Sequence, residues 1–159
     1  MRLLLLAVGR MKAGPERELL GRYLTRAQAG ARGLGIPGVS EVEIEESRAR
    51  STEQRKDEEA VALLAKIPEG AKVLLLHEAG RASSSVELTG MVARARDQGL
   101  PTFCFAIGGP DGIAPSLLAR HDTLSFGAAT FPHQLVRVLV AEQIYRITTI
   151  LAGHPYHRA

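Results

Sequence analysis

The end of the chain concentrates side chains that could handle a nucleic acid. Positions 154–158 read His-Pro-Tyr-His-Arg and bring two imidazoles, a phenol and a guanidinium together. Such groups can hold a phosphate and stack on a base. We expect no metal here, because no cysteine or carboxylate lies near the two histidines and Pro155 breaks their alignment. We predict RNA contacts from His133, Arg137, Arg146 and His154, although a solvated or paired side chain is the alternative for each one alone.

A nucleoside-like ligand is predicted where three apolar runs end. These ends are Leu-His-Glu at 76–78, Gly-Gly at 108–109 and Phe-Gly-Ala-Ala-Thr-Phe at 126–131. In open α/β sheets, ligands bind at the carboxyl ends of strands, where the strand order switches. The second and third ends are small or apolar, so the main chain can approach a flat ring and bond to it between apolar walls.

The glycine-rich segment at 108–112 excludes two classes of protein. Its sequence, Gly-Gly-Pro-Asp-Gly, is not the G-x-G-x-x-G of dinucleotide-binding folds. The chain also lacks the G-K-[ST] of enzymes that bind nucleoside triphosphates. A dinucleotide oxidoreductase and an NTPase are therefore disfavoured. The alternative to a ligand loop is a tight turn in which glycine supplies a positive φ.

The elements that must position these segments alternate along the chain. Apolar runs predict strands, and helical spacing, prolines and the capping boxes at 51–54 and 84–87 predict helices. This alternation predicts an α/β fold, a largely parallel sheet with helices on both faces. The predicted strands are 2–8, 39–45, 72–77, 102–107 and 122–126, and the predicted helices are 15–28, 51–67, 84–99, 116–120 and 132–152.

Length and composition indicate one globular domain, 1–159, in a reducing compartment. The chain has 159 residues, of which 45% are hydrophobic, and no segment resembles a linker. Its single cysteine, Cys104, lies inside an apolar run, which predicts a buried thiol and no internal disulfide. The run 3–8 is too short to span a membrane and lacks the features of a signal peptide. We expect a cytoplasmic protein without membrane contact.

The charged residues are unevenly distributed, although the formal net charge is only +3. The first 40 residues carry seven basic side chains against two acidic ones, and residues 41–59 are rich in acids. From Thr123 onward the only acid is Glu142. Two electropositive ends would suit a surface that faces phosphates, and ordinary solvated helix faces are the alternative.

Several segments in a fixed order resemble the RlmH family of the SPOUT superfamily of methyltransferases. The resemblance covers essentially the whole chain, with little contribution from the acid-rich residues 41–59. The segments are Leu-Ala-Val-Gly at 6–9, Ile-Gly-Gly-Pro-Asp-Gly at 107–112, Leu-Ser-Phe at 124–126, Phe-Pro-His-Gln-Leu-Val-Arg-Val-Leu at 131–139, Glu-Gln-Ile-Tyr-Arg at 142–146 and His-Pro-Tyr-His-Arg at 154–158.

This resemblance implies a fold, a cofactor and a substrate. The fold would contain a deep C-terminal trefoil knot, in an obligate homodimer that binds S-adenosylmethionine in the knot near the subunit interface. The reaction would be methylation of N3 of pseudouridine 1915 in helix 69 of 23S rRNA, on the assembled 70S ribosome. Carried over position by position, the cofactor-binding residues would be Leu76, Gly108, Phe126, Gly127, Ala128, Ala129, Thr130 and Phe131.

The implied reaction suggests roles for the end of the chain. The pseudouridine N3–H must lose its proton before the nitrogen can attack the activated methyl group. His157 is the candidate that assists this step, because an unperturbed imidazole titrates near neutral pH. Arg158 is a candidate for contact with phosphate or with the imidate charge, and Tyr156 for stacking. The apolar helix at 132–152 is the expected dimer seam.

Two other functions fit parts of the sequence. A non-catalytic RNA-binding or ribosome-binding protein with the same fold would show no cofactor binding and a damaged cofactor loop. A small-molecule α/β enzyme with a nucleotide-like ligand would suit the modest net charge. That enzyme would leave the basic, histidine-rich tail without a purpose.

Overall fold

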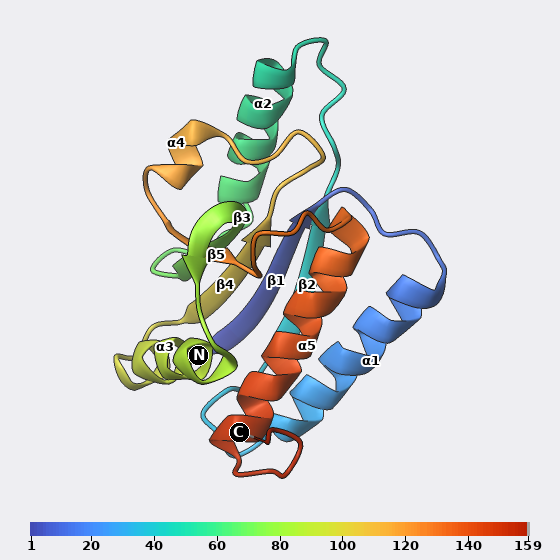
Figure 1. The fold of residues 1–159 in the computed structure, drawn as a ribbon. Coiled ribbons are helices and arrows are strands. Elements are labelled where there is room, and N and C mark those ends of the chain that lie inside the picture. Colours follow the sequence, from blue (N-terminus) through green and yellow to red (C-terminus); the bar gives the residue numbers. More distant parts are fainter. Residues whose placement is uncertain (159) are drawn as a thin grey trace.

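Parallel strands form the centre of the molecule (Figure 1). The computed structural model describes residues 1–158, and within them five strands form one sheet in the order β2-β1-β4-β3-β5. Each neighbouring pair is parallel, as the alternation of strands and helices predicts. The strands are β1 (Arg2–Val8), β2 (Val39–Ile44), β3 (Lys72–Ala82), β4 (Thr102–Ile107) and β5 (Asp122–Ser125).

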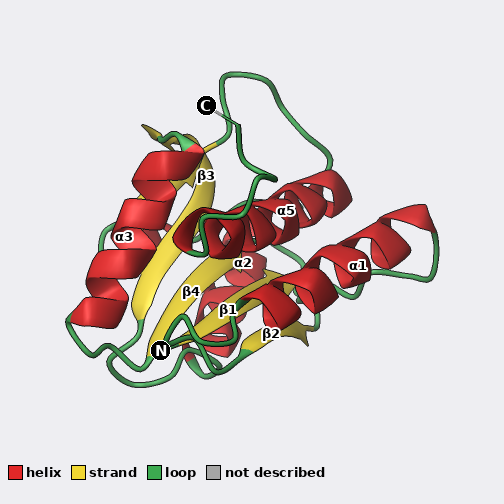
Figure 2. Ribbon diagram, turned by 90° about the horizontal axis from the view of Figure 1, so that it is seen from below, coloured by secondary structure: helices red, strands yellow, loops and turns green. Residues whose placement is uncertain are grey.

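Helices cover both faces of this sheet (Figure 2). One face packs against α1, α3 and α5, and the other packs against α2 and α4. The helix α5 lies against both α1 and α3 and is the longest of the described helices. The helices are α1 (Pro15–Gly30), α2 (Thr52–Leu64), α3 (Ser85–Asp97), α4 (Pro115–Leu118) and α5 (His133–Leu151). No helix in residues 1–158 is long and apolar enough to cross a membrane.

The central strands alternate their side chains between two apolar cores. Leu3 and Leu5 of β1 face the α1, α3 and α5 side, whereas Leu4 and Leu6 face the α2 and α4 side. A strand buried on both faces reads as a continuous apolar run, which is why β1 and β4 were predictable to the residue. Cys104 of β4 is fully buried, which confirms the expected burial, and burial raises the pKa of its thiol to about 12.

Capping residues start two of the helices where the sequence predicts. At Ser84 both bonds of the capping box form, so Glu87 and Ser84 satisfy each other's backbone N–H groups. At Ser51 the side chain accepts the N–H of Gln54 at 3.1 Å, and the side chain of Gln54 makes no reciprocal bond among the described residues. Both helices begin within one residue of the predicted start.

The strand β3 extends further than its apolar run and passes closely over β5. Leu124 pairs first with Leu76 and again with Arg81, so the residues between them form an irregular excursion. A Cβ on Gly80 would lie 2.7 Å from the carbonyl carbon of Leu124 and 2.9 Å from its nitrogen. Only glycine fits where two backbones approach this closely. This explains why position 80, in the part of β3 beyond its apolar run, is glycine.

Candidate active site

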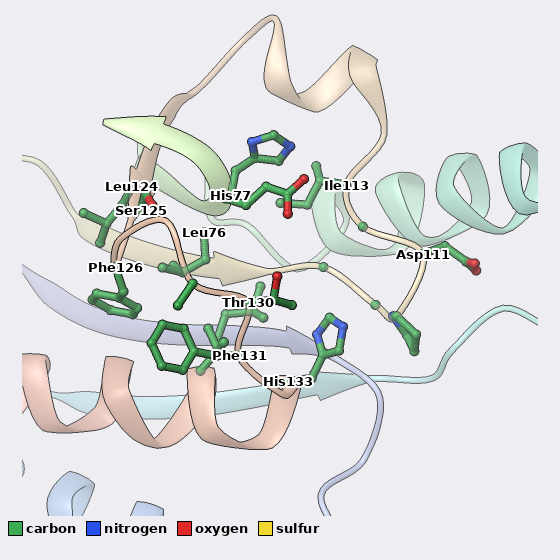
Figure 3. Close-up of a pocket in the computed structure, with 18 of the residues that line it drawn as sticks. Leu76, His77, Asp111, Ile113, Leu124, Ser125, Phe126, Thr130, Phe131 and His133 are labelled. Atoms are coloured by element: carbon green, nitrogen blue, oxygen red, sulfur yellow. The ribbon is translucent and has the colours of Figure 1, made fainter. Parts of the chain in front are cut away.

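A cavity of about 390 Å³ opens at the carboxyl ends of β4 and β5 and beside residues 76–78 of β3, where the pairing of β3 with β4 ends (Figure 3). Its walls come from these residues of β3, the glycine loop 108–112 after β4, the loop 126–131 after β5 and the first turn of α5. This is the edge of a parallel sheet at which ligands bind. Seven of the eight predicted cofactor-binding residues line the cavity, and Ala128 does not; the seven are Leu76, Gly108, Phe126, Gly127, Ala129, Thr130 and Phe131.

The glycine loop is shaped by its own tight turn. The N–H of Gly112 donates to the carbonyl of Gly109 at 2.9 Å, and Gly112 has a φ of +91°. A Cβ on Gly108 would lie 2.6 Å from Ile113 Cγ1 and 3.0 Å from the carbonyl oxygen of Gly112. The tight turn therefore also forms this wall of the cavity. Because a side chain at position 108 would clash within the loop, the loop needs glycine there whether or not a ligand is bound.

An ion pair ties the glycine loop to α2. The Nε and Nη2 atoms of Arg55 donate to the two carboxylate oxygens of Asp111 at 2.5 and 3.1 Å. The same guanidinium donates through Nη1 to the carbonyl oxygens of Ala49 and Arg50. Its hydrogen bonds hold the pKa of Asp111 below its usual value, so this carboxylate stays charged at the rim of the cavity.

The loop after β5 offers main-chain groups to the cavity. Ser125 Oγ accepts the N–H of Gly127 at 3.1 Å and donates to its carbonyl, which turns the chain out of the sheet at a φ of +122°. Residues 127–131 are exposed. Within residues 1–158, no hydrogen bond uses the backbone N–H groups of Ala129, Thr130 and Phe131, so they are free to bind a ligand.

The cavity combines apolar walls with a few charged or polar groups. Leu76, Ile113 and Val136 belong to its apolar part, where a flat ring can pack. Around them lie polar side chains from five different segments, namely Lys56, His77, Glu78, Asp111, Thr130 and His133. Acidic and basic groups are mixed, which suits a ligand that carries charges of both signs.

The predicted catalytic tail packs against the far part of α5. The hydroxyl of Tyr156 donates to Glu142 Oε1 at 3.0 Å, and the Arg146 guanidinium binds the same oxygen at 2.6 and 2.9 Å. His157 Nδ1 lies 3.3 Å from Arg146 Nη1, and the guanidinium stacks 4.7 Å above the Tyr156 ring. Burial, followed by the bond to Glu142, raises the pKa of Tyr156.

The tail and the cavity are separated within one chain. His133 lines the cavity, whereas Arg146 lies 13 residues further along α5, or roughly 20 Å at 1.5 Å per residue. Figure 1 shows α5 running from beside the strand tips to the bottom of the view, where the C-terminus lies. His154 and Arg158 are exposed in the tail.

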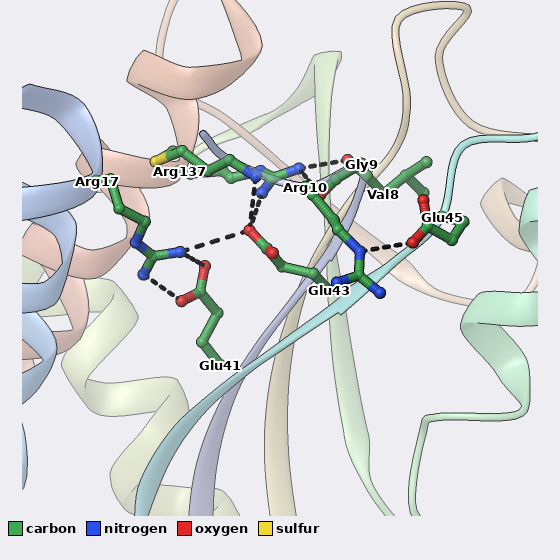
Figure 4. A network of polar contacts seen from close by, with 9 residues as sticks. Val8, Gly9, Arg10, Arg17, Glu41, Glu43, Glu45 and Arg137 are labelled. Carbon is green, nitrogen blue, oxygen red and sulfur yellow. Dashed lines mark hydrogen bonds and ion pairs between the residues drawn. The ribbon is translucent and has the colours of Figure 1, made fainter. Parts of the chain in front are cut away.

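Arg137 requires a correction, because it was predicted to contact RNA. Its side chain is 5% exposed and donates to Glu43 at 2.8 Å and to the carbonyl oxygens of Val8 and Gly9 (Figure 4). A guanidinium enclosed this way cannot reach a phosphate; it joins α5 to the end of β1. The signal was present in the sequence, since Arg137 is four and seven residues before Ala141 and Ile144, which are buried on the same face.

The acid-rich segment also changes the predicted charge pattern. Arg17 binds Glu41 at 2.5 and 3.1 Å, and the exposed Arg10 binds Glu45 at 2.5 Å (Figure 4). Acids of β2 and of the residue that follows it therefore neutralise part of the basic N-terminal region. The exposed basic residues that remain there are Arg2, Lys12, Arg22, Arg26 and Arg32.

Two residues of α2 near the cavity escaped the sequence analysis. Lys56 lines the cavity, and Glu59 lies buried directly behind Gly109. Both are in the acid-rich segment, which reads as a solvated surface. Their spacing from the buried Leu63, seven and four residues, was the available signal that they share its face.

Comparison with known proteins shows the family to which this chain belongs. The family described as "Predicted SPOUT methyltransferase" matches residues 1–157. The chain therefore belongs to the SPOUT methyltransferase family. Its candidate active site is the cavity described above.

The most similar relatives narrow this assignment to one group. A protein of Methylocella silvestris named "Ribosomal RNA large subunit methyltransferase H" is 52% identical, with 99% of each chain covered. A protein of the same name from Methylobacterium radiotolerans is 55% identical, over 99% of this chain and 98% of its own. The resemblance to the RlmH family is thereby confirmed. A solved structure titled "Structural insights into the 2-OH methylation of C/U34 on tRNA" is 16% identical with a TM-score of 0.47, covering 96% of this chain and 98% of that one.

Proposed function

We propose that this chain transfers a methyl group from S-adenosylmethionine to N3 of pseudouridine 1915, in helix 69 of 23S rRNA of the assembled 70S ribosome. The observation that supports it best is the cavity, where segments far apart in the sequence meet at the strand ends. Membership of the SPOUT family supports the reaction class, and the relatives named ribosomal RNA methyltransferases support the substrate.

The residues of the cavity suit this cofactor. A volume of about 390 Å³ is within the range of small-molecule sites, which run from roughly 300 to 1,000 Å³. We propose that the apolar walls around Leu76 and Ile113 hold the adenine and that the N–H groups of residues 129–131 bond to it. The bound cofactor would supply a methyl group already activated on a sulfonium, so no metal is required.

We propose that the protein acts as a homodimer with a shared site. Phe131 and Leu135 are 39% and 44% exposed beside the cavity, and Leu139 continues this apolar strip along α5. Such a strip is typical of a subunit interface. The tail lies roughly 20 Å from the cavity of its own chain, so Tyr156, His157 and Arg158 of the partner subunit are the ones proposed to act there.

In this arrangement we propose a separate role for each side chain. His157 would accept the N3 proton, Arg158 would stabilise the developing imidate charge, and Tyr156 would stack on the base. His133 at the cavity, with Arg146 and His154 near the tail, would contact the RNA. Positioning the nitrogen in line with the methyl group would supply most of the acceleration.

We also propose that the chain carries the trefoil knot expected from the resemblance and works in the cytoplasm. The close approach of Gly80 in β3 to the backbone of Leu124 in β5 supports the knot, because a knot requires such tight contact between segments that cross. Location at the ribosome would follow from the substrate.

Calorimetric titration with S-adenosylmethionine tests the cofactor site. Ala129 lines the cavity and Ala128 does not, although both are small and exposed neighbours. We expect saturable binding by the native protein, at least about 100-fold weaker binding by Ala129→Arg, and near-native binding by Ala128→Arg. Equal loss in both variants would place the cofactor differently, and no binding by the native protein would favour a non-catalytic RNA-binding protein.

Methyl transfer to ribosomes tests the substrate. Radiolabelled methyl groups should enter 23S rRNA of 70S ribosomes that contain the pseudouridine, and not of ribosomes from cells that lack the pseudouridine synthase. Equal labelling of both would show a different target nucleotide.

A further inference from the structure

Glu59 is a buried carboxyl group behind the wall of the cavity. It lies on α2 with 4% of its surface exposed. Its Oε1 atom accepts the N–H of Ser47 at 3.0 Å, whereas Oε2 has no hydrogen-bond partner among residues 1–158. A Cβ on Gly109 would lie 2.7 Å from Oε2, so the bare oxygen rests against the glycine loop. One residue therefore separates this oxygen from the cavity, because Gly109 lines it.

The charged groups around Glu59 do not neutralise the negative charge of its buried carboxylate. Burial is the main reason that its pKa is raised; the hydrogen bond from the N–H of Ser47 lowers it, and the charges of Asp111 and Glu46 raise it further. The guanidinium of Arg55 lowers the pKa but is bound to Asp111. The titratable groups that line the cavity are Lys56 of the same helix, His77 and Glu78 of β3, Asp111 of the glycine loop and His133 of α5.

A bare carboxylate oxygen in this position is costly unless a positive charge comes near it. Removing a charged group from water is strongly unfavourable without a partner. No such partner contacts Oε2 in the described part of the chain. The cavity on the other side of Gly109 is a place where a cation can approach.

We propose that Glu59 is a positioning residue that makes the cavity prefer a cationic ligand over a neutral one of the same shape. This inference rests on the proposed function: S-adenosylmethionine carries a sulfonium, and the product left after methyl transfer is a neutral thioether. Binding of the cation favours the carboxylate, so a proton leaves Glu59 for the solvent as the cofactor enters. Loss of the sulfonium charge after transfer removes that attraction and favours release of the product.

Two calorimetric measurements on the native protein and Glu59→Gln test the proposal. The first compares dissociation constants for S-adenosylmethionine and S-adenosylhomocysteine. We expect the substitution to reduce the preference for the sulfonium about three- to tenfold, as for two charges separated by one residue in a protein medium. The second repeats the titrations in buffers of different ionisation enthalpy. The native protein should release a fraction of a proton with the sulfonium ligand and less with the thioether, and Glu59→Gln should remove this difference.

Controls separate this idea from the proposed function. Glu53→Gln removes the same charge from an exposed position on α2 and should leave the preference unchanged. Protonation of Glu59 competes with binding of the cation, so affinity should rise with pH more in the native protein than in Glu59→Gln. An unchanged preference and unchanged proton release in a folded Glu59→Gln would overturn the role of Glu59 alone. Absence of binding by the native protein would overturn both proposals.

Discussion

The two ends of α5 carry candidate functional sites that differ in the groups that form them. At the cavity end, small residues and main-chain groups form the surface, and rigid supports lie behind them, such as the Arg55–Asp111 pair and Arg137. At the tail end, Glu142, Arg146 and Tyr156 bind one another through their side chains. A main-chain site depends on the fold that holds it, whereas a side-chain cluster depends on a few individual groups. Substitutions should therefore affect the two ends differently.

The largest effect on stability is expected from Arg137→Met. This change leaves Glu43 and two backbone carbonyl groups without their buried partner, which should lower the free energy of unfolding by about 3 to 5 kcal/mol. Urea denaturation at fixed protein concentration measures it. The control is Arg10→Met, whose ion pair with Glu45 is 75% and 71% exposed and should contribute less than about 1 kcal/mol. Equal losses would mean that the cavity end is not held by this contact.

The tail should respond in activity without responding in cofactor binding. His157→Ala is expected to slow methyl transfer roughly 100-fold, the lower range for loss of a general base, while calorimetric affinity for S-adenosylmethionine stays native. Single-turnover rates on ribosomes and titrations of the same preparation measure both. An unchanged rate would remove His157 as the base, and a lost affinity would show that the two ends are not separate.

Gly80→Ala should destabilise the crossing between β3 and β5. The added methyl group would meet the backbone of Leu124, and overpacking of this kind costs about 1 to 3 kcal/mol. Gly21→Ala offers a control of opposite sign, because it lies inside α1 with open space around it and should stabilise by up to about 1 kcal/mol. Thermal unfolding of both variants distinguishes the outcomes, and a stable Gly80→Ala would mean that the crossing relaxes easily.

The smallest effect concerns pH. The folded-state pKa of Asp111 is lowered by Arg55, so its contribution to stability is present above the unfolded pKa of about 3.9 and is lost as pH falls through the folded value. Arg55→Met should move the midpoint of the Asp111 carboxyl upward in an NMR titration. A midpoint that stays low would assign the shift to another group.

The strands and helices followed closely from sequence patterns, because the central strands are apolar on both faces and the helices begin at capping residues or prolines. The wall of the cavity was also predictable, since residues at 76, 108 and 126–131 stand at ends of predicted strands and ligands bind at such ends. The extension of β3 was not predictable, because 78–82 has no strand pattern and is held by its crossing over β5.

By itself, the sequence determined the α/β class, the order of the elements and the three strand ends that form the cavity, because these depend on local periodicity and on rules for parallel sheets. Only the tertiary structure decided which charged groups are free. Arg137 and Glu59 look like surface residues in composition, yet burial against the ends of the strands makes one a structural link and leaves the other a bare carboxylate behind the cavity. Ion pairing and burial join residues as far apart as Val8 and Arg137, and such partners cannot be read from spacing along the chain.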